Sequence, residues 1–204
     1  MNIMKKLIFL LENILKKINL TLLFLLIFTL YALEIKSKER WLLDKTLSTI
    51  TFEVPVLLSK NVKGEFKEIE GLVEIDLKKK QNNKALFSVN TKSVDINYTK
   101  YKDLLLSDIF FFSSEYPLAV IDTKKFSYIN EKEIKLDVEF SLKGKNKILP
   151  LDIYINRLAE ELVQIKSLMI FSRNEFNIGS GKWSNSVILK DKVTIKTNLF
   201  LFKE

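Results

Sequence analysis

The stretch FSRNEFNIG at residues 171–179, closed by GKW at 181–183, decides how the fold of this chain is interpreted. It lies between two segments in which apolar and polar residues alternate, and the second of these runs from Val193 to Phe202. One short connection holds an arginine, an acid, two phenylalanines and two glycines, which is too many specialised residues for a plain turn. We therefore predict a corner, residues 171–183, in which a charged group and aromatic rings fix how two strands meet.

The corner is predicted to be structural rather than catalytic. A guanidinium in a tight corner needs an acceptor, so we expect a pair with Glu175 or Asp191; the alternative is contact with an anionic ligand head group. The two glycines most simply give the turn its positive dihedral angles. The residues assigned to this structural role are Arg173, Phe176, Gly179 and Trp183.

Outward from the corner, a period of two dominates the chain from Trp41 onward. About nine such segments have one apolar face and short polar connections, which is typical of an antiparallel sheet around a single interior. They lie at residues 48–54, 61–67, 71–78, 85–90, 118–128, 134–142, 148–156, 162–170 and 193–201. Closure into a barrel removes exposed edges best, so we predict an all-β antiparallel barrel of about eight strands, with a two-sheet sandwich as the alternative.

One region, residues 94–117, breaks the alternation and predicts a short helical insertion. Thr99 is a candidate helix cap, and the two apolar triplets Leu104–Leu106 and Phe110–Phe112 follow it. Side chains this dense cannot all face one way. The insertion either covers an open barrel end or contributes rings to a ligand cavity, and the two are compatible.

The composition excludes several classes of function. The chain has no cysteine and no histidine, which removes thiol nucleophiles, Ser-His-Asp triads and nearly all zinc sites. No spacing of acids suggests another metal site, so we predict neither an enzyme nor a metal-binding protein. The net charge is +8, but the lysines are scattered and are not interleaved with aromatics, so no nucleic-acid partner is expected.

The N-terminal segment, residues 1–33, is predicted to be a signal peptide or a membrane anchor built on a hydrophobic helix. Lys16 and Lys17 precede an apolar run at residues 18–33 that is long for a signal sequence and short for a spanning helix. A spacer at 34–40 and the barrel domain at 41–204 follow. We expect a periplasmic or other extracytoplasmic location, with the inner membrane as the anchor site if the segment is uncleaved.

Six segments in sequential order resemble the YceI-like family. They are WLLD at 41–44 with STITF at 48–52, GEF at 64–66 with GLVEID at 71–76, LLSDIFF at 105–111 with YP at 116–117, FSLKG at 140–144, the corner at 171–179, and DKVTI at 191–195. The resemblance covers residues 41 to the C-terminus. It implies a lipocalin-like barrel in an exported bacterial protein that encloses a long apolar chain, such as a polyisoprenoid or quinone-like lipid. It also implies homodimers, and it carries over no catalytic residue and no cofactor other than such a lipid.

Two positions depart from that family's pattern. Leu47 and Leu104 stand where relatives often have histidine or another polar residue. If the polar groups touch a ligand head group in relatives, this chain binds a less charged ligand.

The function expected from these observations is non-catalytic binding of a long-chain isoprenoid or similar apolar lipid, for transport, storage or sequestration. Each inward aromatic ring either contacts lipid or fills the core. The alternative is an exported stress-response or protein-interaction module whose barrel is filled by its own side chains; an enzyme using only carboxylates and lysines is a third. The candidate lipid-binding residues are Phe52, Phe66, Phe87, Leu105, Phe110, Phe111 and Phe140.

Overall fold

The computed structural model describes residues 6, 22, 25, 38–128, 130 and 132–204. The chain divides between Lys38 and Glu39 into two units, and everything that follows concerns the second. The predicted N-terminal leader lies outside the described residues except at three positions. Among the residues that are described, no helix is both long and apolar enough to cross a membrane.

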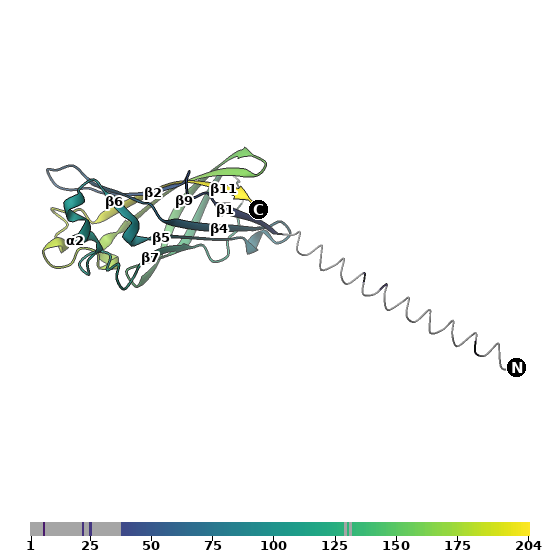
Figure 1. Ribbon diagram of the computed structural model, residues 1–204, viewed down its shortest axis with the longest axis horizontal. Coiled ribbons are helices and arrows are strands. Elements are labelled where there is room, and N and C mark those ends of the chain that lie inside the picture. The colour runs from purple at the N-terminus through teal and green to yellow at the C-terminus, as the bar shows by residue number, and fades with distance from the viewer. Residues whose placement is uncertain (1–5, 7–21, 23–24, 26–37, 129, 131) are drawn as a thin grey trace. The chain divides into compact units, whose positions relative to one another are not determined.

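The described part of the second unit is one antiparallel sheet (Figure 1). Its neighbouring strands follow the order β1-β4-β5-β7-β8-β9-β10-β11-β2-β3-β6, and β1 also pairs with β11. The strands are β1 (Lys38–Leu43), β2 (Thr49–Val54), β3 (Val62–Phe66), β4 (Ile69–Asp76), β5 (Lys84–Asn90), β6 (Val94–Ile96), β7 (Leu118–Asp122), β8 (Glu133–Leu142), β9 (Lys145–Ala159), β10 (Leu162–Ser172) and β11 (Lys192–Lys203).

The pairing closes the sheet into a barrel with eight strand positions, which we call staves. Three of the staves are interrupted, so that each consists of two strands. β1 and β2 form one stave, because both pair with β11. β3 and β4 form the next, because they pair with β2 and β1 on one side and with β6 and β5, which form the third, on the other. The predicted antiparallel barrel of about eight strands is confirmed, and the two-sheet sandwich is wrong. Closure leaves no long unpaired edge, which is the physical advantage of the barrel.

Side chains satisfy the backbone groups that the interruptions would otherwise leave without partners. The hydroxyl of Ser93 accepts hydrogen bonds from the amides of Lys67 and Glu68, at 3.2 and 3.0 Å. Ser48 does the same for the amide of Phe200, at 2.9 Å. Neighbouring strands can therefore be interrupted at the same level of the barrel while the pairing register on either side is kept.

The insertion between β6 and β7 contains α2 (Lys102–Leu106), as predicted, after a 3₁₀ turn at Thr99–Tyr101. Thr99 does not cap the helix, because Tyr101 occupies the cap position and no side-chain bond is made there. The chain then folds back, and the amides of Phe111 and Ser113 donate to the carbonyls of Leu105 and Leu106, both at 3.0 Å. α2 lies at the end of the barrel away from the C-terminus (Figure 1).

The first strand begins earlier than expected. β1 starts at Lys38, inside the segment predicted to be a spacer at 34–40. The reason is that β11 extends far enough to pair with it: the amide of Glu204 donates to the carbonyl of Arg40 at 2.9 Å, and Lys203 forms an ion pair with Glu39.

Candidate functional site

The barrel encloses a cavity of about 1030 Å³. Its wall takes the inward side chains of every stave together with residues of α2 and the corner. A cavity this large lies at the upper end of the range of about 300–1,000 Å³ typical of small-molecule sites. Charged lining residues such as Lys60, Lys100, Lys132 and Arg157 lie in connecting segments or toward strand ends, and the strands between them contribute mainly apolar side chains.

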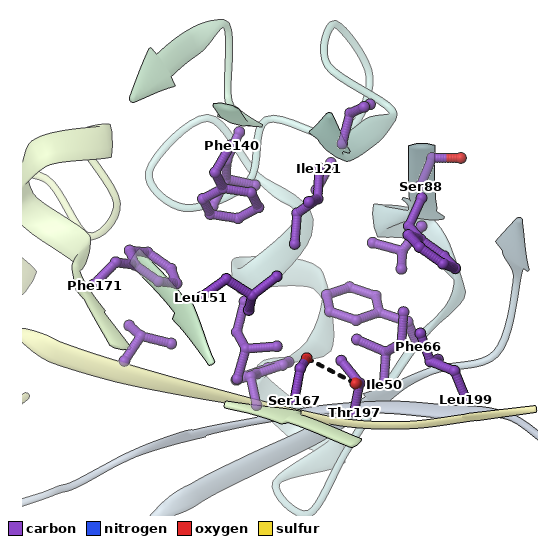
Figure 2. Close-up of a pocket in the computed structure, with 18 of the residues that line it drawn as sticks. Ile50, Phe66, Ser88, Ile121, Phe140, Leu151, Ser167, Phe171, Thr197 and Leu199 are labelled. Carbon is purple, nitrogen blue, oxygen red and sulfur yellow. Dashed lines mark hydrogen bonds between the residues drawn. The ribbon is translucent and has the colours of Figure 1, made fainter. Parts of the chain in front are cut away.

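All seven candidate lipid-binding residues lie on the cavity wall. They come from β2, β3, β5, β8 and the insertion that carries α2, which are far apart in the sequence. Figure 2 shows the rings of Phe66, Phe140 and Phe171 directed into one space, with Ile50, Ile121 and Leu151 around them. The structure thus brings the predicted residues together, and what they bind stays a prediction.

The aromatic side chains form two triads. Phe52, Phe66 and Phe111 lie with ring centroids 5.7–6.2 Å apart. Phe140, Phe171 and Phe176 form a tighter group at 5.2–5.3 Å, in edge-to-face geometry. Such contacts are favourable beyond the area they bury, so the rings give the wall a defined shape rather than a fluid surface. Phe176 is fully buried behind the wall and does not line the cavity.

Two of the rings are held by glycines on the neighbouring strand. Phe52 is the cross-strand partner of Gly64, and Phe87 is the partner of Gly71. A Cβ at either glycine would lie 2.3 Å from a carbon atom of the opposite ring. Each ring therefore lies over bare backbone, which explains physically why glycine stands in these two strands.

Three of the hydroxyl groups on the wall are hydrogen-bonded within the protein. Ser167 and Thr197, partners on β10 and β11, bond to each other at 2.8 Å (Figure 2). Thr123 donates to the carbonyl of Ala85 at 3.2 Å and accepts from its amide at 2.8 Å. Because these hydroxyl groups are already hydrogen-bonded within the protein, they offer few further hydrogen bonds to a polar ligand.

The corner holds a buried guanidinium that forms no ion pair with a carboxylate of the described residues. Arg173, which is 1% exposed, donates to the carbonyls of Ile178 at 2.7 Å, Leu189 at 2.8 Å and Lys190 at 3.1 Å. The predicted ion pair with Glu175 or Asp191 is wrong for the described residues, because the carbonyl of Ile178 and those of Leu189 and Lys190, in the segment before β11, accept from the guanidinium instead. Burial lowers the pKa of Arg173 from its ordinary value, and the nearby charge of Asp191 opposes this.

Two further corner residues, Gly179 and Trp183, connect the corner to the insertion that carries α2. Gly179 has a φ of +81°, and its amide donates to the carbonyl of Ile109 at 2.8 Å, which ties the corner to the insertion. Trp183 packs its ring 5.9 Å from that of Phe110 and lines the cavity. Its buried indole N–H has no hydrogen-bond partner among the described residues.

The two departures from the family pattern lie in different environments. Leu104 lines the cavity, as the expectation of a more apolar site requires. Leu47 does not line it: this side chain is 52% exposed on the turn between β1 and β2. The expectation that both leucines alter the ligand site is therefore wrong for Leu47, because the interruption of the first stave turns it outward.

Sequence reasoning missed part of the wall. Ile153 and Ile155 on β9 and Val163 and Ile165 on the neighbouring strand β10 form an aliphatic part of the cavity wall, in which Ile155 and Ile165 are cross-strand partners. Their alternation was a sufficient signal that they point inward, but an aliphatic residue carries no mark that separates a ligand contact from core packing. Tyr98 and Tyr101, which lie on the wall next to α2, gave no periodic signal.

No group of three acidic residues that could hold a metal ion occurs in the part of the chain that the structure describes. The fold and the cavity define the class: an antiparallel β-barrel with an apolar interior able to bind an apolar ligand. The YceI-like domain model matches residues 41–201, and the chain belongs to this family.

Solved structures agree with this fold. The chain is similar to Burkholderia cenocepacia BcnA, with a TM-score of 0.71 and 20% identity over 78% of this chain and 98% of that one. A polyisoprenoid binding domain from Saccharophagus degradans gives 0.64 and 15% identity over 80% and 98%. The Campylobacter jejuni YCEI protein gives 0.63 and 21% over 74% and 89%. A search of curated protein sequences found no match.

Proposed function

We propose that this protein binds a long-chain isoprenoid or similar apolar lipid inside the barrel, without catalysis, for transport, storage or sequestration. The observation that carries the proposal is the continuous apolar cavity of about 1030 Å³. The Saccharophagus degradans domain of the same fold is described as polyisoprenoid binding, which supports this class of ligand.

The size of the cavity argues that it is filled in use. The wall is mainly apolar, so water inside the cavity would make few hydrogen bonds to the protein. An apolar chain removes the same surface from water at about 25 cal/mol per Å² buried.

The alternative, a protein-interaction module with a side-chain-filled barrel, requires an interior without a continuous void. The cavity favours the lipid-binding function over it. An enzyme would need acids and lysines that converge on the substrate. The basic residues on the wall instead stand apart, at Lys60 and Lys100 near α2 and at Lys132 and Arg157 toward the β9–β10 hairpin.

The proposed ligand carries an uncharged or weakly polar end group, such as that of a quinone-like lipid. Leu104 adds an apolar side chain to the wall at α2, and Arg173 already donates to backbone carbonyls. The indole N–H of Trp183, which is buried without a partner among the described residues, is a donor for one acceptor on the ligand.

The location of the protein outside the cytoplasm is likewise a proposal. The lysine-flanked apolar segment at 18–33 supports export to the periplasm or beyond, with the membrane as an attachment site if the segment stays. Pairing into homodimers rests on the family alone.

Native mass spectrometry of the full chain, followed by lipid extraction, tests the proposal. We expect a mass excess that an extracted apolar lipid accounts for. Complete absence of bound lipid under mild desolvation, combined with no uptake of an added prenylated quinone, would exclude lipid carriage. A tightly bound pyrophosphate-bearing lipid would contradict the uncharged end group while leaving the binding class intact.

A further inference from the structure

Two loops at the α2 end of the barrel present apolar side chains to solvent. One loop joins β2 to β3 and the other leads from the corner to β11, and they are bonded together: the amide of Leu57 donates to the carbonyl of Ile188 at 2.9 Å. Figure 1 shows both loops at the end that carries α2. We name the apolar tip by its four side chains, with their exposed fractions: Leu57 (44%), Leu58 (98%), Val187 (59%) and Ile188 (54%).

Leu58 is unfavourable for stability in two ways. Its side chain gains nothing from burial, and its φ of +55° places a leucine in the left-handed region that glycine or asparagine adopts at lower cost. A scattered surface leucine needs no explanation, but one that combines full exposure with this backbone conformation points to a role outside the folded monomer.

The segments around the tip carry charge of one sign only. Residues 55–61, 97–102 and 180–190 include lysines at 60, 100, 102, 182 and 190 and no aspartate or glutamate. None of these lysines forms an ion pair within the described part of the chain. Elsewhere on the barrel, lysines such as Lys124 and Lys135 stand between acids. An apolar tip with lysines on the neighbouring segments is the pattern of a surface that enters an anionic lipid interface.

The tip is continuous with the cavity. Ile188, Lys60 and Tyr101 all line it, and the hydroxyl of Tyr98 donates to the carbonyl of Lys60 at 3.1 Å. A surface inserted here would bring the cavity wall next to lipid tails.

We propose that the apolar tip and its lysines dock this barrel on an anionic lipid bilayer, so that lipid exchanges through the α2 end. A protein partner fits less well, because protein interfaces are depleted in lysine. The inference extends the proposed function by naming the surface on which the carrier works. The membrane-docking proposal is tested by vesicle binding, whereas the proposed function is tested by lipid content. Either proposal can therefore fail while the other stands.

The absence of cysteine makes the test direct, since one introduced thiol takes one label. The full chain with Leu58→Cys, carrying an environment-sensitive fluorophore, is mixed with vesicles of phosphatidylcholine containing phosphatidylglycerol, and separately with phosphatidylcholine alone. The matched control is Leu158→Cys, a half-exposed leucine in β9 near the β9–β10 hairpin. We expect a blue shift at position 58 that needs the anionic lipid and weakens with salt, and none at position 158.

Charge variants complete the test. In the labelled chain, Lys100→Gln with Lys182→Gln should weaken vesicle binding reported at position 58 by about fivefold per lysine, whereas Lys147→Gln with Lys166→Gln should not. No shift at 58, an equal shift at 158, or equal effects of both lysine pairs would overturn the proposal. So would a shift at 58 that a soluble protein produces and vesicles do not. Bound lipid in native mass spectrometry together with any of these results would leave the proposed function standing.

Discussion

A Cβ atom placed on Gly179 would lie 2.6 Å from Nη1 of Arg173, and the same nitrogen donates to the carbonyl of Ile178 at 2.7 Å. The guanidinium is therefore held by the carbonyl of Ile178 and packed against the backbone of Gly179. The corner depends on both residues at once.

Gly179→Ala should destabilise the barrel by about 2–4 kcal/mol, because a φ of +81° strains alanine and the new methyl group displaces the guanidinium from its acceptor. Denaturant unfolding followed by tryptophan fluorescence measures this loss. Gly181→Ala is the matched control: its φ is +61° and its Cβ would meet nothing within 4 Å, so about 1 kcal/mol of strain is expected. Equal losses in the two variants would show that contact with Arg173 is not the cause.

Arg173→Lys should cost about 3 kcal/mol or more, although it keeps the charge. A compact ammonium cannot reach the carbonyls of Ile178, Leu189 and Lys190 together, and buried acceptors would be left without donors. The comparison variant is Arg40→Lys, whose exposed ion pair with Glu204 should contribute less than about 1 kcal/mol. Chemical denaturation measures both, and a tolerated Arg173→Lys would mean that charge alone holds the corner.

Filling the cavity should expel the ligand without unfolding the barrel. Ala85 and Ala119 are buried on the wall, so Ala85→Leu with Ala119→Leu places new methyl groups in the void rather than in packed core. We expect severalfold less copurified lipid by extraction, with a thermal midpoint that is unchanged or higher. Leu86→Phe, half exposed on β5, is the control and should leave lipid content unchanged. Undiminished lipid in a folded double variant would place the ligand elsewhere.

Asp44 should make the barrel sensitive to acid. Its pKa is lowered from the ordinary 3.8 chiefly by the hydrogen bond from the Thr46 hydroxyl, and then by the amides of Leu47 and Thr46. A carboxylate with a depressed folded pKa stabilises the protein above its unfolded pKa, and this stabilisation is lost as the pH falls through the folded value. The unfolding midpoint should therefore decline below about pH 4.

Asp44→Asn keeps a hydrogen-bond acceptor at every pH, so its unfolding midpoint should decline less steeply in that range. Asp95→Asn, on the exposed side of β6, is the matched variant and should follow the unsubstituted chain. Parallel acid profiles for all three proteins would argue against a role for the turn at Asp44.

The barrel was predictable from the sequence because alternation is a local property. Segments such as the one at 134–142 show which side chains face inward without knowledge of their neighbours, and β8 (Glu133–Leu142) follows that segment closely. The interruptions of three staves were not predictable. They depend on Ser48 and Ser93 reaching backbone groups 152 and 25–26 residues away in the chain.

The candidate site likewise has a part that the sequence predicted and a part that it did not. Inward direction placed Phe52, Phe66, Phe87 and Phe140 on the wall, and aromatic density in the insertion placed Phe110 and Phe111 there. Local pattern could not reveal the partners of Arg173, because two of the acceptor carbonyls, those of Leu189 and Lys190, lie 16 and 17 residues further along the chain. Nor could it reveal the apolar tip, whose two loops meet from positions 57 and 188.

Taken by itself, the sequence determined the family, the antiparallel barrel and the apolar character of its interior, since each follows from residue type and a period of two. Only the tertiary structure decided that the interior holds a cavity rather than a filled core. Whether inward side chains meet at the centre depends on the diameter of the barrel. The number of strands and the shear between them together determine that diameter. For the corner at 171–183, the sequence determined where the strands turn, and the folded chain decided that carbonyl oxygens, not carboxylates, surround Arg173.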